Sequence, residues 1–227
     1  MWDYYQGEGE NSFAGALPRL SYLVQRAQKL VATPNKQEIL NIGVGGGHLE
    51  YLAARSGFIP NSLDPSPVAI EKIQLKGFTG KVGVIESIPY SNELFDITFC
   101  SEVLEHLSRE SLEKGVSEIH RTLKRKGYFI GTVPYSELLE GNKVICPHCA
   151  QEFHRWGHQQ SFNKGAMESL LKRNDFSIIR LETHSFTNTN TDNLTGKIRA
   201  IGSKVLGRLG VAIANPSLVF IAQKVNL

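Results

Sequence analysis

The feature that most constrains this chain is an alternation of apolar segments and helical patterns between residues 37 and 134. Apolar runs such as ILNI and FDITFC are each followed by apolar residues at helical spacing, with glycine or proline at the boundaries. Strands that alternate with helices in this way favour a parallel sheet covered by helices on both faces. We therefore predict an α/β fold with a doubly wound, Rossmann-like sheet.

The same patterns predict one domain over residues 1–227, with a helical lid at 1–35. Two segments interrupt the alternation: a Cys/His-containing insertion at 137–160, and an insertion at 187–214 that carries a basic amphipathic helix. The predicted strands are 37–43, 58–64, 81–87, 94–100, 128–134, 177–186 and 217–225, and the predicted helices are 12–32, 48–57, 65–77, 101–127 and 163–176.

Four glycines stand in the five positions from Gly43 to Gly47, directly after the first predicted strand. Such a turn lets a ligand approach bare backbone at a helix N-terminus, although a tight strand–helix turn alone also uses glycine. The dinucleotide spacing G-x-G-x-x-G fails because His48 stands where its last glycine belongs. No Tyr-x-x-x-Lys pair and no Gly-Lys-Ser/Thr sequence is present. The spacing G-x-G-x-G is met.

Together with the segments after it in the chain, this turn resembles the class I S-adenosylmethionine-dependent methyltransferases, over residues 37–134 and on toward the C-terminus. EILNIGVGGG is similar to the family's first motif, NSLDPSP to its second, and VGVIESIPYSNELFDITFCSEVLEHL and LKRKGYFIGTVP to its later ones. The resemblance implies a seven-stranded, mostly parallel sheet with an antiparallel final pair. It also implies methyl transfer to a small-molecule, glycan or lipid-linked acceptor, with oxygen as the expected acceptor atom.

The resemblance also implies a set of cofactor contacts, with Asp64 on the ribose hydroxyls. The other interpretation of Asp64 is an N-cap for the helix that begins near Pro65, and both roles could hold at once. Two positions depart from the family pattern: Asn41 replaces the usual acid before the glycines, and Val84 replaces the acid that reaches the adenine amine. The implied contacts are Asn41, Gly43, Val44, Gly45, Gly47, Asp64, Ile85, Glu86, Cys100 and Ser101.

The segment CPHCAQEFHRWGH places two cysteines and two histidines at the spacing C-x2-C-x4-H-x3-H. Two thiolates and two imidazoles suit tetrahedral zinc. We expect a structural zinc ion on Cys146, Cys149, His154 and His158. The other interpretation is a loop in which the histidines occur by chance.

A second metal pattern is SEVLEHL, which places Glu102, Glu105 and His106 together. Relatives that methylate catechols or RNA 3′ ends use a similar E-x-x-E-H with a distant histidine as a magnesium site, and His158 could be that histidine. This hypothesis competes with zinc for His158. His106 and His158 are also the candidate catalytic residues.

The overall charge and the cysteine count limit the possible partners. A net charge of +3 is too small to favour nucleic acid. Three cysteines and a polar, acidic start to the chain favour the cytoplasm. Residues 196–210 could bind a membrane surface, or form a solvated helix. Two functional alternatives stay open: a cofactor- or zinc-binding protein without methyl transfer, and a different Rossmann-like enzyme.

Overall fold

The computed structural model of the protein describes residues 13, 15–31, 33, 36–186 and 216–225. A seven-stranded sheet in the order β3-β2-β1-β4-β5-β9-β8 forms its centre. The strands are β1 (Glu38–Ile42), β2 (Ile59–Asp64), β3 (Thr79–Val82), β4 (Phe95–Ser101), β5 (Leu123–Pro134), β8 (Phe176–His184) and β9 (Ser217–Lys224).

The strand pairing confirms the predicted fold class. The pairs from β3 through β5 are parallel, whereas β9 is antiparallel to both β5 and β8. The chain runs outward from β1 to β3, then returns to place β4 on the other side of β1. The order therefore reverses between β1 and β4, and open α/β sheets bind ligands outside the strand ends at such a point.

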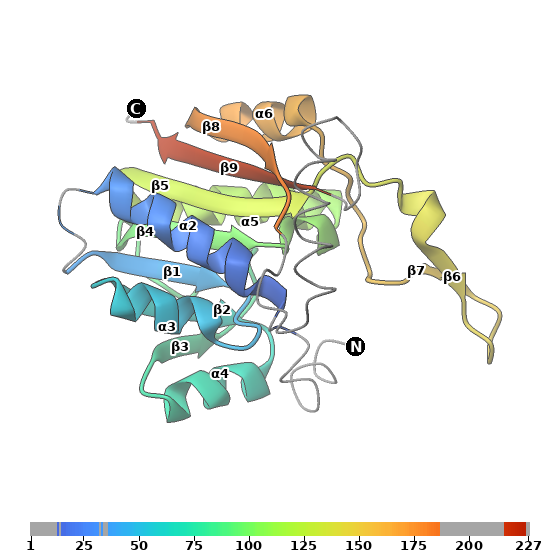
Figure 1. The fold of residues 1–227 in the computed structure, drawn as a ribbon, viewed down its shortest axis with the longest axis horizontal. Coiled ribbons are helices and arrows are strands. Elements are labelled where there is room, and N and C mark those ends of the chain that lie inside the picture. Colours follow the sequence, from blue (N-terminus) through green and yellow to red (C-terminus); the bar gives the residue numbers. More distant parts are fainter. Residues whose placement is uncertain (1–12, 14, 32, 34–35, 187–215, 226–227) are drawn as a thin grey trace, which may run out of the picture.

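Helices cover both faces of this sheet (Figure 1). Helices α2 (Leu17–Leu30) and α3 (His48–Arg55) pack on one face, where Leu23, Ala27 and Leu49 join a buried cluster with residues of β1, β4, β5 and β9. Helices α5 (Arg109–Thr122) and α6 (Lys164–Arg173) pack on the opposite face. Helix α4 (Pro67–Leu75) forms a smaller cluster beside β2 and β3.

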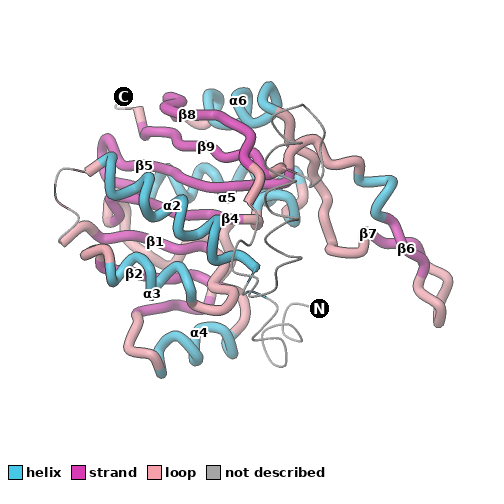
Figure 2. The backbone as a smooth tube through the Cα atoms, in the orientation of Figure 1, coloured by secondary structure: helices cyan, strands magenta, loops and turns pink. Residues whose placement is uncertain are grey.

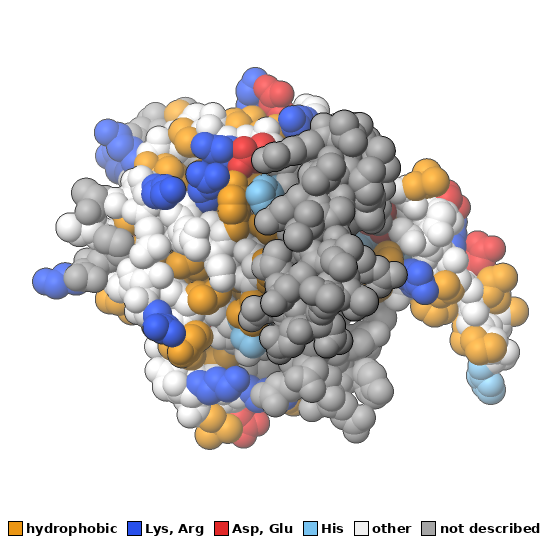
Figure 3. All heavy atoms as spheres, viewed as in Figure 1, with side chains coloured by type: hydrophobic (Ala, Val, Ile, Leu, Met, Phe, Trp, Pro, Cys, Tyr) orange, Lys and Arg blue, Asp and Glu red, His pale blue; other side chains and the backbone are white. Residues whose placement is uncertain are grey.

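An arm, residues 135–162, projects from the end of β5 (Figures 1 and 2). It contains a short 3₁₀ helix, η3 (Leu139–Asn142), and an antiparallel pair, β6 (Lys143–Ile145) with β7 (Glu152–His154). Apolar side chains are visible along it in Figure 3; those exposed there are Leu138, Ile145, Phe153 and Trp156. The sequence predicted this insertion but not its hairpin.

Two predicted elements differ from the structure. Strand β3 ends at Val82, so 83–86 is a loop rather than part of a strand. The helices predicted across 101–127 are a 3₁₀ turn, η2 (Leu104–His106), and α5, but residues 123–127 belong to strand β5. Glu102, which precedes η2, has a left-handed backbone (φ 57°) that a helix does not contain.

Some predictions fall on residues outside the described ones. These are the first part of the lid at 1–35 and all of the insertion at 187–214, including its basic helix. Within the described residues, none of the helices has the length and apolar character needed to span a membrane.

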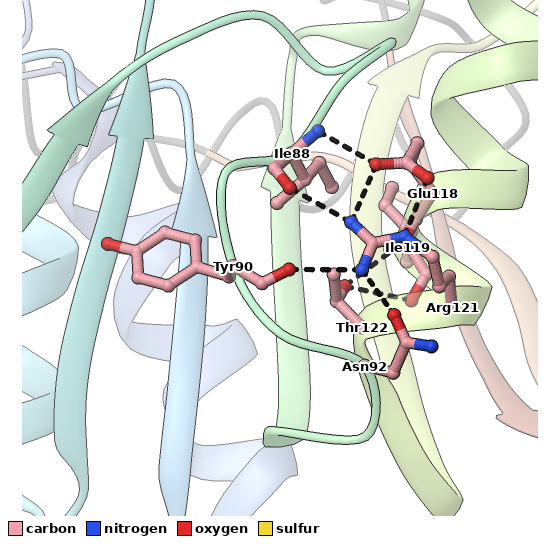
Figure 4. A network of polar contacts seen from close by, with 7 residues as sticks. All are labelled: Ile88, Tyr90, Asn92, Glu118, Ile119, Arg121 and Thr122. Carbon is pink, nitrogen blue, oxygen red and sulfur yellow. Dashed lines mark hydrogen bonds and ion pairs between the residues drawn. The ribbon is translucent and has the colours of Figure 1, made fainter.

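A guanidinium group fixes the loop that leads into β4 (Figure 4). Arg121 of α5 donates to the backbone oxygens of Tyr90 (3.0 Å) and Ile88 (2.9 Å) and to the side chain of Asn92 (2.6 Å). Glu118 pairs with Arg121 and also accepts from the Ile88 backbone nitrogen (2.8 Å). This network holds the chain between the 83–86 loop and β4 against the helix behind it.

The centre of the sheet predicts one strong stability effect. A Cβ at Gly131 would lie 2.1 Å from the Cys100 carbonyl oxygen and 2.5 Å from the Phe220 ring. The Cys100 carbonyl belongs to the backbone of a central strand, which cannot move away without disturbing the hydrogen bonds of the sheet. We therefore expect Gly131→Ala to lower the free energy of unfolding by about 2–4 kcal/mol, measured by urea denaturation.

The matched control is Gly165→Ala at an exposed position of α6, where the added methyl meets nothing closer than 3.5 Å. This change should raise stability by up to about 1 kcal/mol because alanine favours a helix. Equal midpoints for the two variants would contradict the packing described for Gly131.

Candidate active site

The glycine turn adopts the backbone that its spacing predicts. Gly43, Gly45 and Gly47 have positive φ angles of 84°, 54° and 74°, whereas Gly46 is not among the positive-φ residues. A Cβ at Gly43 would also lie 2.7 Å from the Val103 side chain. The frame G-x-G-x-G is therefore the one in which glycine is structurally required.

Behind the turn lies a buried carboxylate. Glu50, in the first turn of α3, is fully buried. Its Oε1 accepts from Asn41 Nδ2 (2.7 Å) and from Ser62 Oγ (2.6 Å). Burial raises the pKa of Glu50 above its usual range. Position 41 thus lacks the usual acid, but the buried Glu50 places a carboxyl group in contact with Asn41.

Asp64 closes β2 opposite the turn. Its Oδ2 accepts from the Val44 backbone nitrogen (2.8 Å) and its Oδ1 from the Ser66 nitrogen (2.9 Å). The residue that caps α4 is Ser66, whose side chain accepts from Ala69. The alternative interpretation of Asp64 as that helix cap is therefore wrong, and its carboxylate instead ties β2 to the glycine turn.

The other predicted cofactor contacts divide into two groups. Ile85, Glu86 and Ser101 line the same cavity as the glycine turn. Cys100 does not: its side chain is fully buried in the core on the α5 face, and burial raises its pKa. Successive side chains of a strand point to opposite faces, and Cys100 lies one residue before the strand's end at Ser101, so we correct this assignment.

The cavity has a volume of about 570 Å³. It joins the glycine turn at the end of β1 to residues that follow β4 and to the arm. Apart from the residues already named, it is lined by Phe13, Ala16, Arg19, Leu20, Ile42, Gly46, His48, Leu49, Leu63, Pro65, Gly83, Val84, Glu102, Val103, Glu105, His106, Leu107, Trp156 and His158.

Three ionisable side chains lie together in the lining of this cavity: Glu105, His106 and His158. Glu105 is 1% exposed, and neither of its carboxylate oxygens makes a hydrogen bond to another described residue. Burial, and then the nearby Glu102 charge, raise its pKa well above the usual range. Burial, and then His158, lower the pKa of His106 to about 4, so this ring is neutral at physiological pH. The His106 and His158 rings meet edge to face at 4.6 Å.

The arm brings His158 to this place through backbone contacts. The Glu105 carbonyl oxygen accepts from the backbone nitrogens of Gln159 (2.7 Å) and Gln160 (3.0 Å). Gln159 also donates from its side chain to the His106 carbonyl oxygen (2.8 Å). The two histidines that the sequence proposed as catalytic residues are therefore neighbours.

The expected Cys₂His₂ zinc site is not assembled. Among the described residues, two groups of three potential ligands lie within 4.8 Å of one another: Glu105/His106/His158 and Glu137/His154/His158. Neither contains a cysteine. His154 pairs with Lys143 at the base of the hairpin, whereas Cys146 lies three residues further along, about 10 Å away by strand geometry.

The ligand pattern Glu102/Glu105/His106 is also only partly assembled. Glu102 is absent from the group and lies instead 4.0 Å from the Arg19 guanidinium. One carboxylate and two imidazoles suit a divalent transition metal better than magnesium, which prefers oxygen ligands.

Three polar residues of this site were not predicted from the sequence. Arg19 of α2 donates to Ser101 (3.0 Å) at the end of β4. Glu50 could have been found as a charged residue beside the apolar positions Leu49 and Ala53 of its helix. Glu137 is the first acid after β5, at the sheet edge where ligands bind.

Known proteins share both the sequence motifs and the fold of this chain. The family model of a methyltransferase domain matches residues 40–131. The chain is 32% identical over 104 residues to an uncharacterized methyltransferase of Synechocystis sp., covering 45% of this chain and 49% of that protein. It is 28% identical over 118 residues to the ubiquinone biosynthesis O-methyltransferase of Rickettsia canadensis, covering 49% of each. The chain thus spans about half the length of these relatives.

Solved structures agree over a larger share of the chain. A Haloferax volcanii chain solved in complex with a methyltransferase activator matches with a TM-score of 0.71 at 15% identity, covering 100% of this chain and 98% of that one. The Burkholderia thailandensis 1,6-didemethyltoxoflavin-N1-methyltransferase, solved with S-adenosylhomocysteine, matches with a TM-score of 0.68 at 14% identity, covering 99% and 86%. These likenesses concern the fold. The sequence match assigns residues 40–131 to a methyltransferase domain, and the solved structures show that the described fold is the one that methyltransferases of known structure adopt.

Proposed function

We propose that this protein transfers a methyl group from S-adenosylmethionine to an oxygen atom of a small-molecule, glycan or lipid-linked acceptor. The observation that carries the proposal is the lining of one cavity. The glycine turn and Asp64, called the cofactor end below, line the same cavity as His106 and His158, called the acceptor end. A donor bound on the turn would therefore share this cavity with an acceptor bound beside the two histidines.

The residues at the cofactor end fit the cofactor. The positive φ angles of the turn leave bare backbone for close approach. Each Asp64 oxygen accepts one backbone N–H, and a carboxylate offers about four acceptor positions, enough to accept ribose hydroxyls as well. Ile85 and Glu86, which line the same cavity, would contact the adenine.

The cofactor itself supplies the activated methyl group, and the protein's contribution is to position the reactants. Methyl transfer needs the acceptor oxygen in line with the sulfonium methyl group, and holding two reactants so can remove several kcal/mol of the barrier. Apolar side chains that line the cavity, such as Leu20 and Leu107, would limit the access of water to that contact. An obvious nucleophile in the protein is not required.

Oxygen as the acceptor atom is supported by the relatives. The curated proteins of Rickettsia canadensis and Rickettsia felis are ubiquinone biosynthesis O-methyltransferases. Two imidazole groups near the acceptor end would suit removal of a hydroxyl proton. A lipid-linked acceptor would bring a cytoplasmic enzyme to the membrane surface, and the basic segment 196–210, outside the described residues, would provide that contact.

We predict that the protein binds S-adenosylhomocysteine and not NAD in isothermal titration calorimetry. Asp64→Asn should weaken S-adenosylhomocysteine binding roughly 10- to 100-fold, because hydrogen bonds to a charged acceptor are lost. Absence of binding to either ligand would favour a Rossmann-like protein without methyl transfer.

The matched control is Asp96→Asn. Asp96 accepts from the Glu38 backbone nitrogen (2.8 Å) and pairs with Lys124 at the opposite end of β4, away from the cavity. This variant makes the same chemical change and should bind the ligand as the wild type does. Equal loss of binding in both variants would mean that Asp64 acts only through stability.

A second candidate is metal-assisted methyl transfer on Glu105, His106 and His158. Two buried Glu105 oxygens without a hydrogen bond favour it, since an uncompensated buried carboxylate is costly. A divalent ion there would compensate that carboxylate and polarise the acceptor oxygen. The Cys146 and Cys149 pair would then have no part in the ion's site.

This candidate predicts that the wild type takes up one Zn²⁺ or Mn²⁺ per chain, measured by elemental analysis after dialysis against the ion. Glu105→Gln should abolish this uptake, because the carboxylate charge is lost. Cys146→Ser should leave it unchanged. Metal loss in the cysteine variant alone would restore the Cys₂His₂ interpretation, and a metal-free wild type would remove both.

A further inference from the structure

Glu137 links the two ends of the arm next to the cavity. The residue lies three positions after β5, and its side chain is 6% exposed. Its Oε2 lies 2.5 Å from His158 Nδ1, and its backbone oxygen accepts from Ser161 Oγ (2.7 Å). The neighbouring Ser136 nitrogen donates to the Phe162 carbonyl oxygen (2.8 Å). Glu137 and His158 therefore face each other where the outgoing and the returning segments of the arm leave and rejoin the sheet.

The groups around the Glu137 carboxylate show which neighbouring nitrogen atoms carry a proton. Its Oε1 accepts from Asn142 Nδ2 (2.8 Å). His154 Nδ1 accepts from the His158 backbone nitrogen (3.0 Å), so in the neutral ring the proton is on Nε2, the nitrogen 3.4 Å from Glu137 Oε1. Glu137 Oε1 therefore accepts a hydrogen bond from Asn142 and lies beside the His154 ring, which leaves Oε2 for His158.

His158 is the remaining partner of Glu137. An ionised carboxylate only accepts hydrogen bonds, so His158 Nδ1 must carry the proton that it shares with Glu137. In the neutral ring, Nε2 then has a lone pair. Because Nδ1 is occupied by Glu137, Nε2 is the nitrogen that His158 can direct to Glu105 and His106 in the cavity.

We propose that Glu137 is the positioning residue of the acceptor end: it accepts the Nδ1–H of His158 and thereby fixes the tautomer in which Nε2 presents a lone pair to the cavity. The catalytic consequence rests on the proposed function. When the acceptor oxygen forms its bond to the methyl carbon, the carbon–sulfur electrons return to sulfur. The hydroxyl proton leaves for His158 Nε2.

The arrangement has a known physical purpose. Catalytic and metal-binding histidines commonly donate their second ring nitrogen to a carboxylate, which fixes ring orientation and increases basicity. The stacking of His154 on His158, with ring centroids 4.7 Å apart, further restricts the ring. The arm therefore contributes the histidine, its orienting carboxylate and the residue that stacks on it.

Glu137→Gln is a sharp test because the surroundings dictate how the amide will lie. Asn142 donates an N–H to the Oε1 position, so the amide oxygen should occupy it. The amide NH₂ then faces His158 Nδ1 and can only donate. The variant should therefore switch His158 to the opposite tautomer, with the proton on Nε2.

The experiment is a two-bond proton–nitrogen correlation spectrum of the full chain labelled with ¹⁵N-histidine, at a pH where the rings are neutral. His158→Gln assigns the signal. We expect the wild type to show protonated Nδ1 and unprotonated Nε2 at His158, and Glu137→Gln to exchange them. Glu140→Gln is the matched control, since Glu140 is an exposed acid of the same arm paired with Lys143; it should leave the tautomer unchanged.

A wild-type His158 with its proton on Nε2, or an unchanged tautomer in Glu137→Gln, would overturn the proposal. If this variant does not fold, the wild-type spectrum alone decides. Once an acceptor is identified, Glu137→Gln should lower kcat at least about tenfold, with unchanged S-adenosylhomocysteine affinity. If the wild type shows protonated Nδ1 and unprotonated Nε2 at His158 but binds no S-adenosylhomocysteine, the proposed function is refuted and the role of Glu137 is retained.

Discussion

The cofactor end of this molecule depends on a carboxylate that water cannot reach. Glu50 joins three elements at one point, since it belongs to α3 and accepts from Asn41 of β1 and Ser62 of β2. Apolar packing of α3 on the sheet would tolerate small rotations of the helix, because the hydrophobic effect has no direction. Two hydrogen bonds to one buried oxygen do not tolerate such rotations. Breaking them would leave buried polar groups unsatisfied, which costs more free energy than the bonds contribute when made. The glycine turn between β1 and α3 is therefore held at both of its ends.

The same carboxylate explains why asparagine can stand at position 41. An acid here would place a second negative charge next to Glu50, within the low dielectric of the core, where like charges repel strongly. Asn41 instead donates its amide nitrogen to Glu50 and, more weakly, to the Gly43 carbonyl oxygen. Its side-chain oxygen is then the atom that it can offer to the cavity. The departure from the family pattern is compensated by Glu50, whose place in the helix could not be seen from the motif.

Much of the fold and half of the site could be predicted from the sequence. The β1, β2, β4 and α3 elements were found because apolar runs and helical spacing act locally, and the glycine frame was found because positive φ restricts residue type. The errors arose where long-range contacts decide. Cys100 was assigned to the cofactor together with Ser101 because the resemblance identifies the end of this strand, whereas which of two successive side chains faces the cavity depends on the sheet. The Cys₂His₂ set was inferred from spacing alone, but pairing of Lys143 with His154 separates imidazoles from thiols along the hairpin.

The two ends of the cavity thus differ in how they are built. The cofactor end uses backbone and one carboxylate from residues 40–131, the segment matched by the family. The acceptor end takes Glu105 and His106 from this segment, but Glu137, Trp156 and His158 come from the arm after it. Loops placed on a rigid sheet can vary without loss of the core, so under the proposed function the choice of acceptor would depend on the arm. A change of acceptor between relatives would therefore require a change in the arm and none in the glycine turn.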